Sequence, residues 1–113
     1  MAGIIELLDP LYEVAYKIPH LKLRTQLINS GEAISPLFAE GFAKRRNQKE
    51  ILRFYEMAMA ESDEVISHLT KAEVLSKRFH SISYQKVLYL KDRYKSLSKQ
   101  INRMIKVYGS YKK

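Results

Sequence analysis

Apolar residues recur at alternating steps of three and four residues along two long segments of the chain. In residues 48–77 the repeating positions are Ile51, Tyr55, Ala58, Ser62, Val65, Leu69 and Ala72. In residues 83–108 they are Val87, Leu90, Tyr94, Leu97, Ile101, Met104 and Tyr108. Because this spacing places the apolar side chains on one face of a helix, it predicts two long helices with coiled-coil-like packing.

The same spacing over about residues 4–17 predicts a first helix, with Ile4, Leu8, Leu11, Ala15 and Ile18 on its apolar face. Pro10 interrupts this pattern. Asp9-Pro10 also matches an N-cap followed by a proline at the first helical position, so the alternative is a helix that starts there, preceded by a separate turn. Ile18-Pro19-His20 is expected to end the helix.

A second helix is predicted over about residues 21–45, where the apolar face contains Leu27, Gly31, Ile34, Phe38 and Phe42. Pro36 lies inside this segment. Since proline lacks an amide hydrogen and crowds the carbonyl four residues earlier, a kink is expected near residues 32–33.

Polar residues mark the expected helix boundaries. Asn47 and Glu50 have the spacing of a capping box, which starts the third helix at about residue 48. That helix is predicted to end near Arg78, and Ser81 or Ser83 is expected to cap the fourth.

Together these elements predict one all-α domain over residues 1–113, an antiparallel up-down-up-down four-helix bundle. The sequence has only four Gly and three Pro, as expected for long helices. Phe54 and Met57, with Met59 nearby, form a second apolar row on the third helix, which belongs either to the core or to a contact with another subunit. Since a bundle of this size gains from association, a homo-oligomer is expected.

The composition also limits the cellular context. No apolar run approaches the ~20 residues of a membrane span, and the N-terminus lacks the basic start of a signal peptide. The chain contains no Cys, which excludes disulfides and thiolate metal sites. We therefore expect a cytoplasmic protein without membrane contact.

Charge is distributed unevenly along the chain, whose formal net charge is +8. Residues 1–70 hold eight Lys or Arg and ten Asp or Glu, whereas residues 71–113 hold twelve and two, a net charge of +10. In the fourth helix, cations recur every four residues and form what we call the basic row: Lys91, Lys95, Lys99 and Arg103, with Lys106 beside them. Four-residue spacing of like charges destabilises a helix slightly, so an anionic ligand along this row is expected, and a merely solvated face is the alternative.

Phosphates are the anions that such a row suits, so binding of RNA or DNA is predicted, through the backbone and not by base sequence. A second basic group at the end of the second helix is expected to assist: Lys44, Arg45, Arg46 and Lys49. The cations at residues 44–46 also have a structural explanation, because they lie where a helix dipole favours positive charge. Tyr89 and Tyr111 are the tyrosines expected to be exposed, and they are available for stacking on bases.

The sequence contains no pattern typical of a catalytic or metal-binding site. Helical di-metal sites use Glu-x-x-His motifs, but Glu64 and His68 are separated by one residue too many. Glu40 and Glu64 are expected to form ion pairs or hydrogen bonds, with Arg53 or the backbone, and not to act as acid and base. We therefore predict no enzymatic activity, no cofactor and no metal.

A gap-free motif across residues 26–64 resembles a known family. It comprises Gln26-Leu27, residues 33–41 (Ala-Ile-Ser-Pro-Leu-Phe-Ala-Glu-Gly), Lys49-Glu50, Arg53-Phe54 and residues 58–64. The family is that of the four-helix bundle proteins named for the intervening sequences of large-subunit rRNA, which includes the accessory variability determinants of diversity-generating retroelements. The chain departs from the family signature at Ala33, Leu37 and Ala60-Glu61, where the family has Ser, Asn and Gly-Ser.

The resemblance implies a homopentameric four-helix bundle. Within the family, one role is that of the accessory protein that partners a reverse transcriptase and its template RNA, and the alternative is that of the plain rRNA-associated members, which share the same features. The alternative from another functional class is a structural or protein-interaction module whose basic row binds an acidic protein partner.

Overall fold

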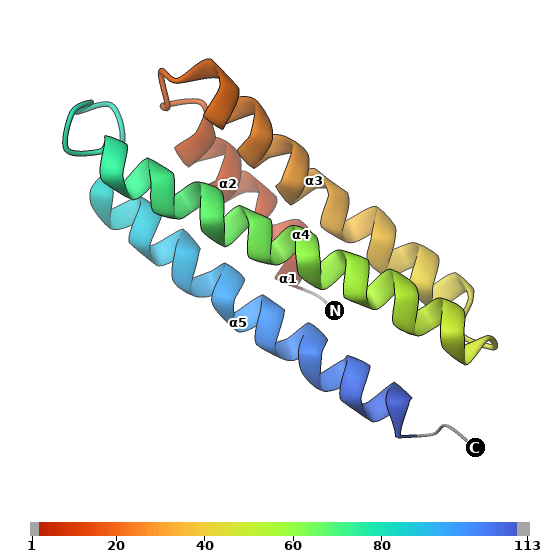
Figure 1. Cartoon of the computed structure of the whole chain (residues 1–113). Coiled ribbons are helices and arrows are strands. Elements are labelled where there is room, and N and C mark those ends of the chain that lie inside the picture. Colours follow the sequence, from red (N-terminus) through yellow and green to blue (C-terminus); the bar gives the residue numbers. More distant parts are fainter. Residues whose placement is uncertain (1–2, 111–113) are drawn as a thin grey trace.

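The computed structural model describes residues 3–110, and every regular element in this range is an α-helix (Figure 1). The elements are α1 (Gly3–Glu6), α2 (Leu8–Ala15), α3 (Leu21–Ala43), α4 (Gln48–Leu75) and α5 (Tyr84–Gly109). Four helices, α2 to α5, pack against one another, and α4 makes the most extensive contacts, with α3 and with α5. The molecule is elongated, with principal extents of 53 × 20 × 19 Å. The prediction of an all-helical fold with four packed helices is confirmed.

The N-terminal segment forms two short helices in place of the single first helix. The break lies at Leu7, which accepts a hydrogen bond from the Leu11 amide and donates one to the Gly3 carbonyl. Pro10 has no amide hydrogen to donate to Glu6, so the helical hydrogen-bond pattern is interrupted one turn before the proline. The alternative prediction, a separate turn followed by a second helix start near Pro10, is correct in that α1 is a separate turn of helix, but α2 starts at Leu8 and Asp9 lies in its first turn, so Asp9 is not the N-cap.

Side chains cap the three long helices. Asn47 Oδ1 accepts from the Glu50 amide at 3.2 Å, and Ser83 Oγ accepts from the Lys86 amide at 3.2 Å, which confirms both predicted caps. The side chain of Glu50 does not return to Asn47 and bonds Arg53 instead. His20, which was expected only to follow a helix end, caps α3 by accepting from the Leu23 amide at Nδ1.

The core contains most of the residues that the apolar spacing predicted. Phe42, expected on the apolar face of the second helix, is instead 54% exposed, and Leu8 is only partly buried. All seven predicted positions of α4 are buried, and in α5 the first five are buried while Met104 and Tyr108 are partly buried. An aromatic cluster packs between α3, α4 and α5. Phe38 stacks on Tyr55 with a distance of 4.4 Å between ring centroids, and Tyr108 contacts Tyr55 edge-on at 5.7 Å.

Two glycines of α3 permit close helix contacts. A Cβ on Gly41 would lie 2.7 Å from the Tyr55 ring, and one on Gly31 would lie 2.5 Å from Leu11 Cδ1. Neither glycine has a positive φ. Their lack of a side chain, and not their backbone freedom, is therefore what the packing uses.

The three long helices extend past the N-terminal ones. α1 and α2 contain 4 and 8 residues, whereas α5 contains 26, or about 39 Å of helix. Figure 1 shows α1 and α2 toward the end of the molecule that holds the α4–α5 loop, while α3, α4 and α5 continue to the other end. α3 continues through Pro36, and the kink stays a prediction. Among residues 3–110, no helix has both the length and the apolar character needed to cross a membrane.

Candidate nucleic-acid interface

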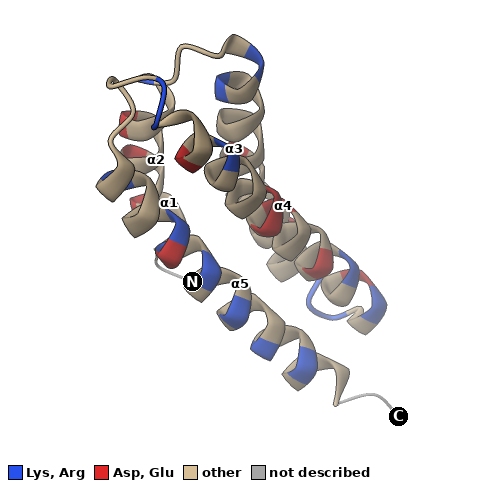
Figure 2. Cartoon of the chain, turned by 60° about the vertical axis from the view of Figure 1, so that its left-hand side comes forward, with Lys and Arg blue, Asp and Glu red and all other residues tan. Residues whose placement is uncertain are grey.

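Most of the basic row lies on the exposed surface of α5. The side chains of Lys95, Lys99, Arg103 and Lys106 are exposed, and within residues 3–110 none of the four forms an ion pair. Figure 2 shows the cationic positions repeating along one side of α5. With a rise of 1.5 Å per residue, the four positions span about 17 Å. They form an exposed line of positive charge.

Lys91, the first residue of the row, has a different environment. Its Nζ lies 2.9 Å from Glu73 Oε1 on α4, and the two side chains are 17% and 28% exposed. This ion pair joins α4 to α5 and neutralises the charge of Lys91 locally. The sequence pattern placed Lys91 with the other four cations, but the structure separates it from them.

Polar side chains next to Lys95 and Lys99 also link the two helices. Ser98 Oγ lies 2.8 Å from Asp63 Oδ1 and 2.8 Å from Ser62 Oγ, and Ser62 donates to the Tyr94 carbonyl at 3.2 Å. These groups hold the side of α5 that faces α4. The four exposed cations are consequently displayed on a helix whose inner face is fixed.

The second basic group lies in the turn between α3 and α4. Lys44 forms an exposed ion pair with Glu40 at 3.8 Å, and Arg45 covers the Phe42 ring at 4.4 Å. Arg46 and Lys49 are exposed and form no ion pair within the described residues.

The two basic groups lie at the same end of the molecule. The Gln48 side-chain amide, at the start of α4, donates a hydrogen bond to the Tyr108 carbonyl near the end of α5. This contact holds the α3–α4 turn against the helix end that carries Arg103 and Lys106. Spacing along the sequence could not predict this, because the two segments are 60 residues apart.

The tyrosine predictions are tested in part. Tyr89 is 60% exposed, as expected, whereas Tyr111 lies outside the described residues. Tyr94 is buried, and burial raises the pKa of its hydroxyl well above the usual value. Arg93, which follows Tyr89 by one helical turn, was not singled out because it does not fit the four-residue spacing of the row.

The acidic residues of the motif do not form a metal site in the described part of the chain. No three His, Asp or Glu side chains gather there with a geometry suited to a metal ion. Glu64 lies 3.4 Å from Ser30 Oγ and 3.9 Å from His68 Nε2, while Glu40 pairs with Lys44. Arg53, the expected partner of the motif glutamates, pairs with Glu50. Burial lowers the pKa of His68, and the nearby Lys71 acts in the same direction.

No family model, curated protein or solved structure matches the chain. The family resemblance of residues 26–64 therefore stays a prediction.

Proposed function

We propose that this protein is a non-enzymatic helical protein that binds nucleic acid through α5. The observation that supports this most directly is the line of four exposed cations without ion-pair partners among residues 3–110: Lys95, Lys99, Arg103 and Lys106. Arg46 and Lys49 extend the same charge at one end of the molecule. RNA or DNA would be held by its phosphates, with little dependence on base sequence.

The dimensions of the line agree with this proposal. About 17 Å corresponds to roughly five phosphates of one strand along a duplex axis, at about 3.4 Å each. Neighbouring cations of the line repel one another in the free protein, and phosphates would remove that repulsion.

A salt titration tests the proposal. A fluorescently labelled 20-nucleotide RNA, or a DNA of the same length, is bound at increasing salt concentrations, and affinity is measured by anisotropy. Neutralisation of four phosphates gives a log–log slope of about −3. An affinity that does not change with salt would reject phosphate binding by this surface.

The second candidate function is a protein-interaction module that binds an acidic partner, since the same cations suit carboxylates. Polyglutamate serves as the competitor in the same assay. Displacement of the nucleic acid by equimolar charge of polyglutamate would favour this candidate, whereas retention of the nucleic acid supports the first.

We further propose that the helices alternate in direction, up-down-up-down, and that the bundle assembles into a homo-oligomer. Figure 1 places the α3–α4 turn and the α4–α5 loop at opposite ends of the molecule, which supports the alternation.

Phe42 and Val107 are more than half exposed at the end that α1 and α2 do not reach, which supports assembly of the bundle into a homo-oligomer. Light scattering should give a multiple of the 13.2 kDa chain mass. A pentamer, as the family resemblance implies, would have a mass of about 66 kDa, five times 13.2 kDa, whereas a monomer at micromolar concentration would exclude assembly.

Within the resembled family, a role as the accessory protein of a retroelement reverse transcriptase is the more specific proposal. The exposed cations of α5 support it only as far as they support RNA binding. A gene for a reverse transcriptase and a variable repeat beside the gene for this protein would favour that role, and their absence would favour the plain rRNA-associated class.

A further inference from the structure

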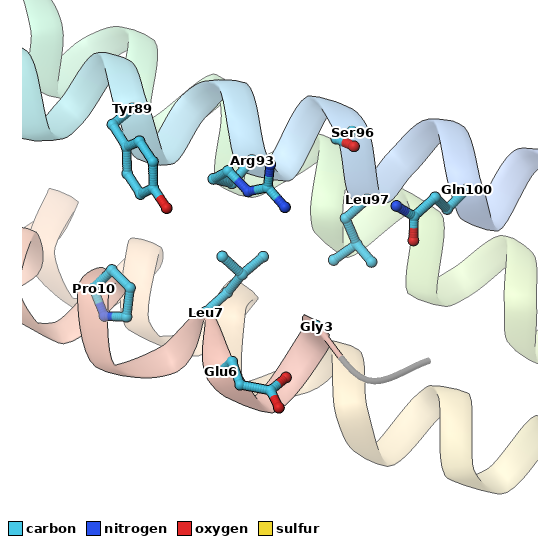
Figure 3. Close-up of a pocket in the computed structure, with 9 residues that line it drawn as sticks. All are labelled: Gly3, Glu6, Leu7, Pro10, Tyr89, Arg93, Ser96, Leu97 and Gln100. Carbon is cyan, nitrogen blue, oxygen red and sulfur yellow. The ribbon is translucent and has the colours of Figure 1, made fainter.

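A small pocket of about 210 Å³ lies between α5 and the two N-terminal helices (Figure 3). Leu7, Pro10 and Leu97 supply its apolar surface, and polar side chains complete its lining: Glu6, Tyr89, Arg93, Ser96 and Gln100. The volume equals that of about seven water molecules in the liquid. A planar aromatic heterocycle with one ring or two fused rings is of this size.

The polar groups of the pocket are available for a ligand. Glu6 and Arg93 are both exposed, and within residues 3–110 neither takes part in an ion pair or a side-chain hydrogen bond. Figure 3 shows Glu6 on α1 and Arg93 on α5, on opposite walls with the Leu7 side chain between them. The pocket lining thus includes an acceptor-only carboxylate on α1 and a donor-only guanidinium on α5, on either side of the apolar Leu7 side chain.

Tyr89 adds an aromatic surface at one end of the pocket. Its ring is 60% exposed and projects from α5 toward Pro10 (Figure 3). Aromatic side chains of this kind stack on unpaired bases in proteins that bind single-stranded nucleic acid.

We propose that this pocket binds an unpaired guanine base. The Watson–Crick edge of guanine presents two adjacent N–H donors, which suit the Glu6 carboxylate, and the O6 acceptor beside them suits Arg93 or Gln100. No other common base combines two adjacent donors with a neighbouring acceptor on that edge. Leu7, Pro10 and Tyr89 would contact the faces of the ring.

This inference rests on the proposed function, because the pocket would add a preference for one base to the binding of phosphates by the exposed cations of α5. Ser96 and Gln100 line the pocket, and Lys99 and Arg103 each follow one of them by three residues. Residues three apart are neighbours on a helix surface. One strand can therefore place phosphates on Lys99 and Arg103 while a base enters the pocket, which requires a single-stranded substrate.

The direct test is an NMR titration of the full chain with guanosine 5′-monophosphate, compared with the adenosine, cytidine and uridine monophosphates. Binding in the pocket shifts the amide signals of Tyr89, Ser96 and Gln100, with affinity for the guanosine nucleotide about tenfold above the others. Equal shifts for all four nucleotides, or shifts confined to residues outside the pocket, would overturn the inference.

Two variants give the test a matched control. Glu6→Gln replaces the carboxylate by an amide of similar shape and should abolish the guanosine preference. Glu56→Gln makes the same charge change at an exposed position of α4 outside the pocket and should keep the preference. If both variants keep it, Glu6 does not recognise the base and the inference is wrong.

Failure of the inference is distinguishable from failure of the proposed function. Absence of a guanosine preference, together with salt-dependent binding of a uridine 12-mer, would contradict only the proposed guanine site. Absence of 12-mer binding, with shifts of the pocket residues' amide signals still caused by the guanosine nucleotide, would contradict only the proposed function.

Discussion

Lys91 Nζ contacts Glu73 Oε1 at 2.9 Å, so the first cation of the basic row helps to hold α5 on α4. Lys91→Gln should therefore act mainly on folding. We expect a loss of up to about 1 kcal/mol in the free energy of unfolding, since the pair is only partly buried. Circular dichroism during urea unfolding measures this change.

Lys95→Gln is the matched control for that substitution. Lys95 is exposed and has no ion pair within residues 3–110, so its replacement should leave stability unchanged and weaken nucleic-acid binding. An Lys91→Gln variant that lost as much affinity as the Lys95→Gln variant, at unchanged stability, would show that the Glu73 contact does not hold in solution.

Gly41 is required for the contact of α3 with the aromatic cluster. Gly41→Ala places a Cβ at 2.7 and 2.8 Å from two Tyr55 ring carbons and 3.1 Å from Phe54 Cβ. Because the buried ring cannot move away freely, we expect a destabilisation of about 1–3 kcal/mol, measured by urea unfolding.

Gly109→Ala provides the comparison, because nothing lies within 4 Å of its added Cβ. The gain in helix propensity should make that variant neutral or slightly stabilised. Gly31→Ala should fall between the two, since the Leu11 side-chain end that it meets can shift. A Gly41→Ala protein as stable as the parent would contradict the packing described here.

Periodicity predicted the helices and their buried faces because both depend on local spacing. The predicted positions between Ile51 and Ala72 and between Val87 and Ile101 are buried. Asn47 and Ser83 cap helices because the amide oxygen of Asn and the hydroxyl oxygen of Ser accept hydrogen bonds from free backbone amides. Capping by His20 was missed, since histidine lacks the usual preference for that position.

The site was predicted less completely, because charge spacing does not reveal partners on other helices. Lys91 and Lys95 are equivalent in the sequence pattern, and only the position of Glu73 separates them. The contact of Gln48 with Tyr108 and the pocket lined by Glu6 and Arg93 both bring distant segments together, and they depend on how the helices are packed.

His68 should make stability depend on pH. Its side chain is buried between α3 and α4, and burial together with Lys71 lowers its pKa below 6.5, although Glu64 acts in the opposite direction. At pH values between the lowered pKa and the unfolded value of about 6.5, the unfolded chain therefore binds more protons than the folded one. Stability contributed by neutral His68 is complete above that pH and decreases as the pH falls toward the lowered pKa.

Comparison with His68→Gln isolates this effect, because other titrating groups such as Glu61 are common to both proteins. The stability of the parent relative to the variant should fall between pH 7.5 and 5.5, as measured by urea unfolding at each pH. An NMR titration that gave His68 a pKa above 6.5 would reverse the sign and contradict this prediction.

The central claim is that four exposed cations of α5 bind phosphates. Its variant replaces all four by Gln, which keeps helix propensity: Lys95→Gln, Lys99→Gln, Arg103→Gln and Lys106→Gln. A control removes the same charge from exposed lysines elsewhere in the chain: Lys17→Gln, Lys22→Gln, Lys71→Gln and Lys77→Gln. Helicity and oligomer mass are checked for both proteins.

The decisive measurement is the salt dependence of binding to a labelled single-stranded RNA for the parent and these two variants. We predict that the α5 variant binds more weakly and that its log–log salt slope is shallower by about 3, at roughly 0.7 to 0.9 per phosphate contact, while the control keeps a slope near that of the parent. An α5 variant with the affinity and slope of the parent would contradict the claim that this surface binds nucleic acid.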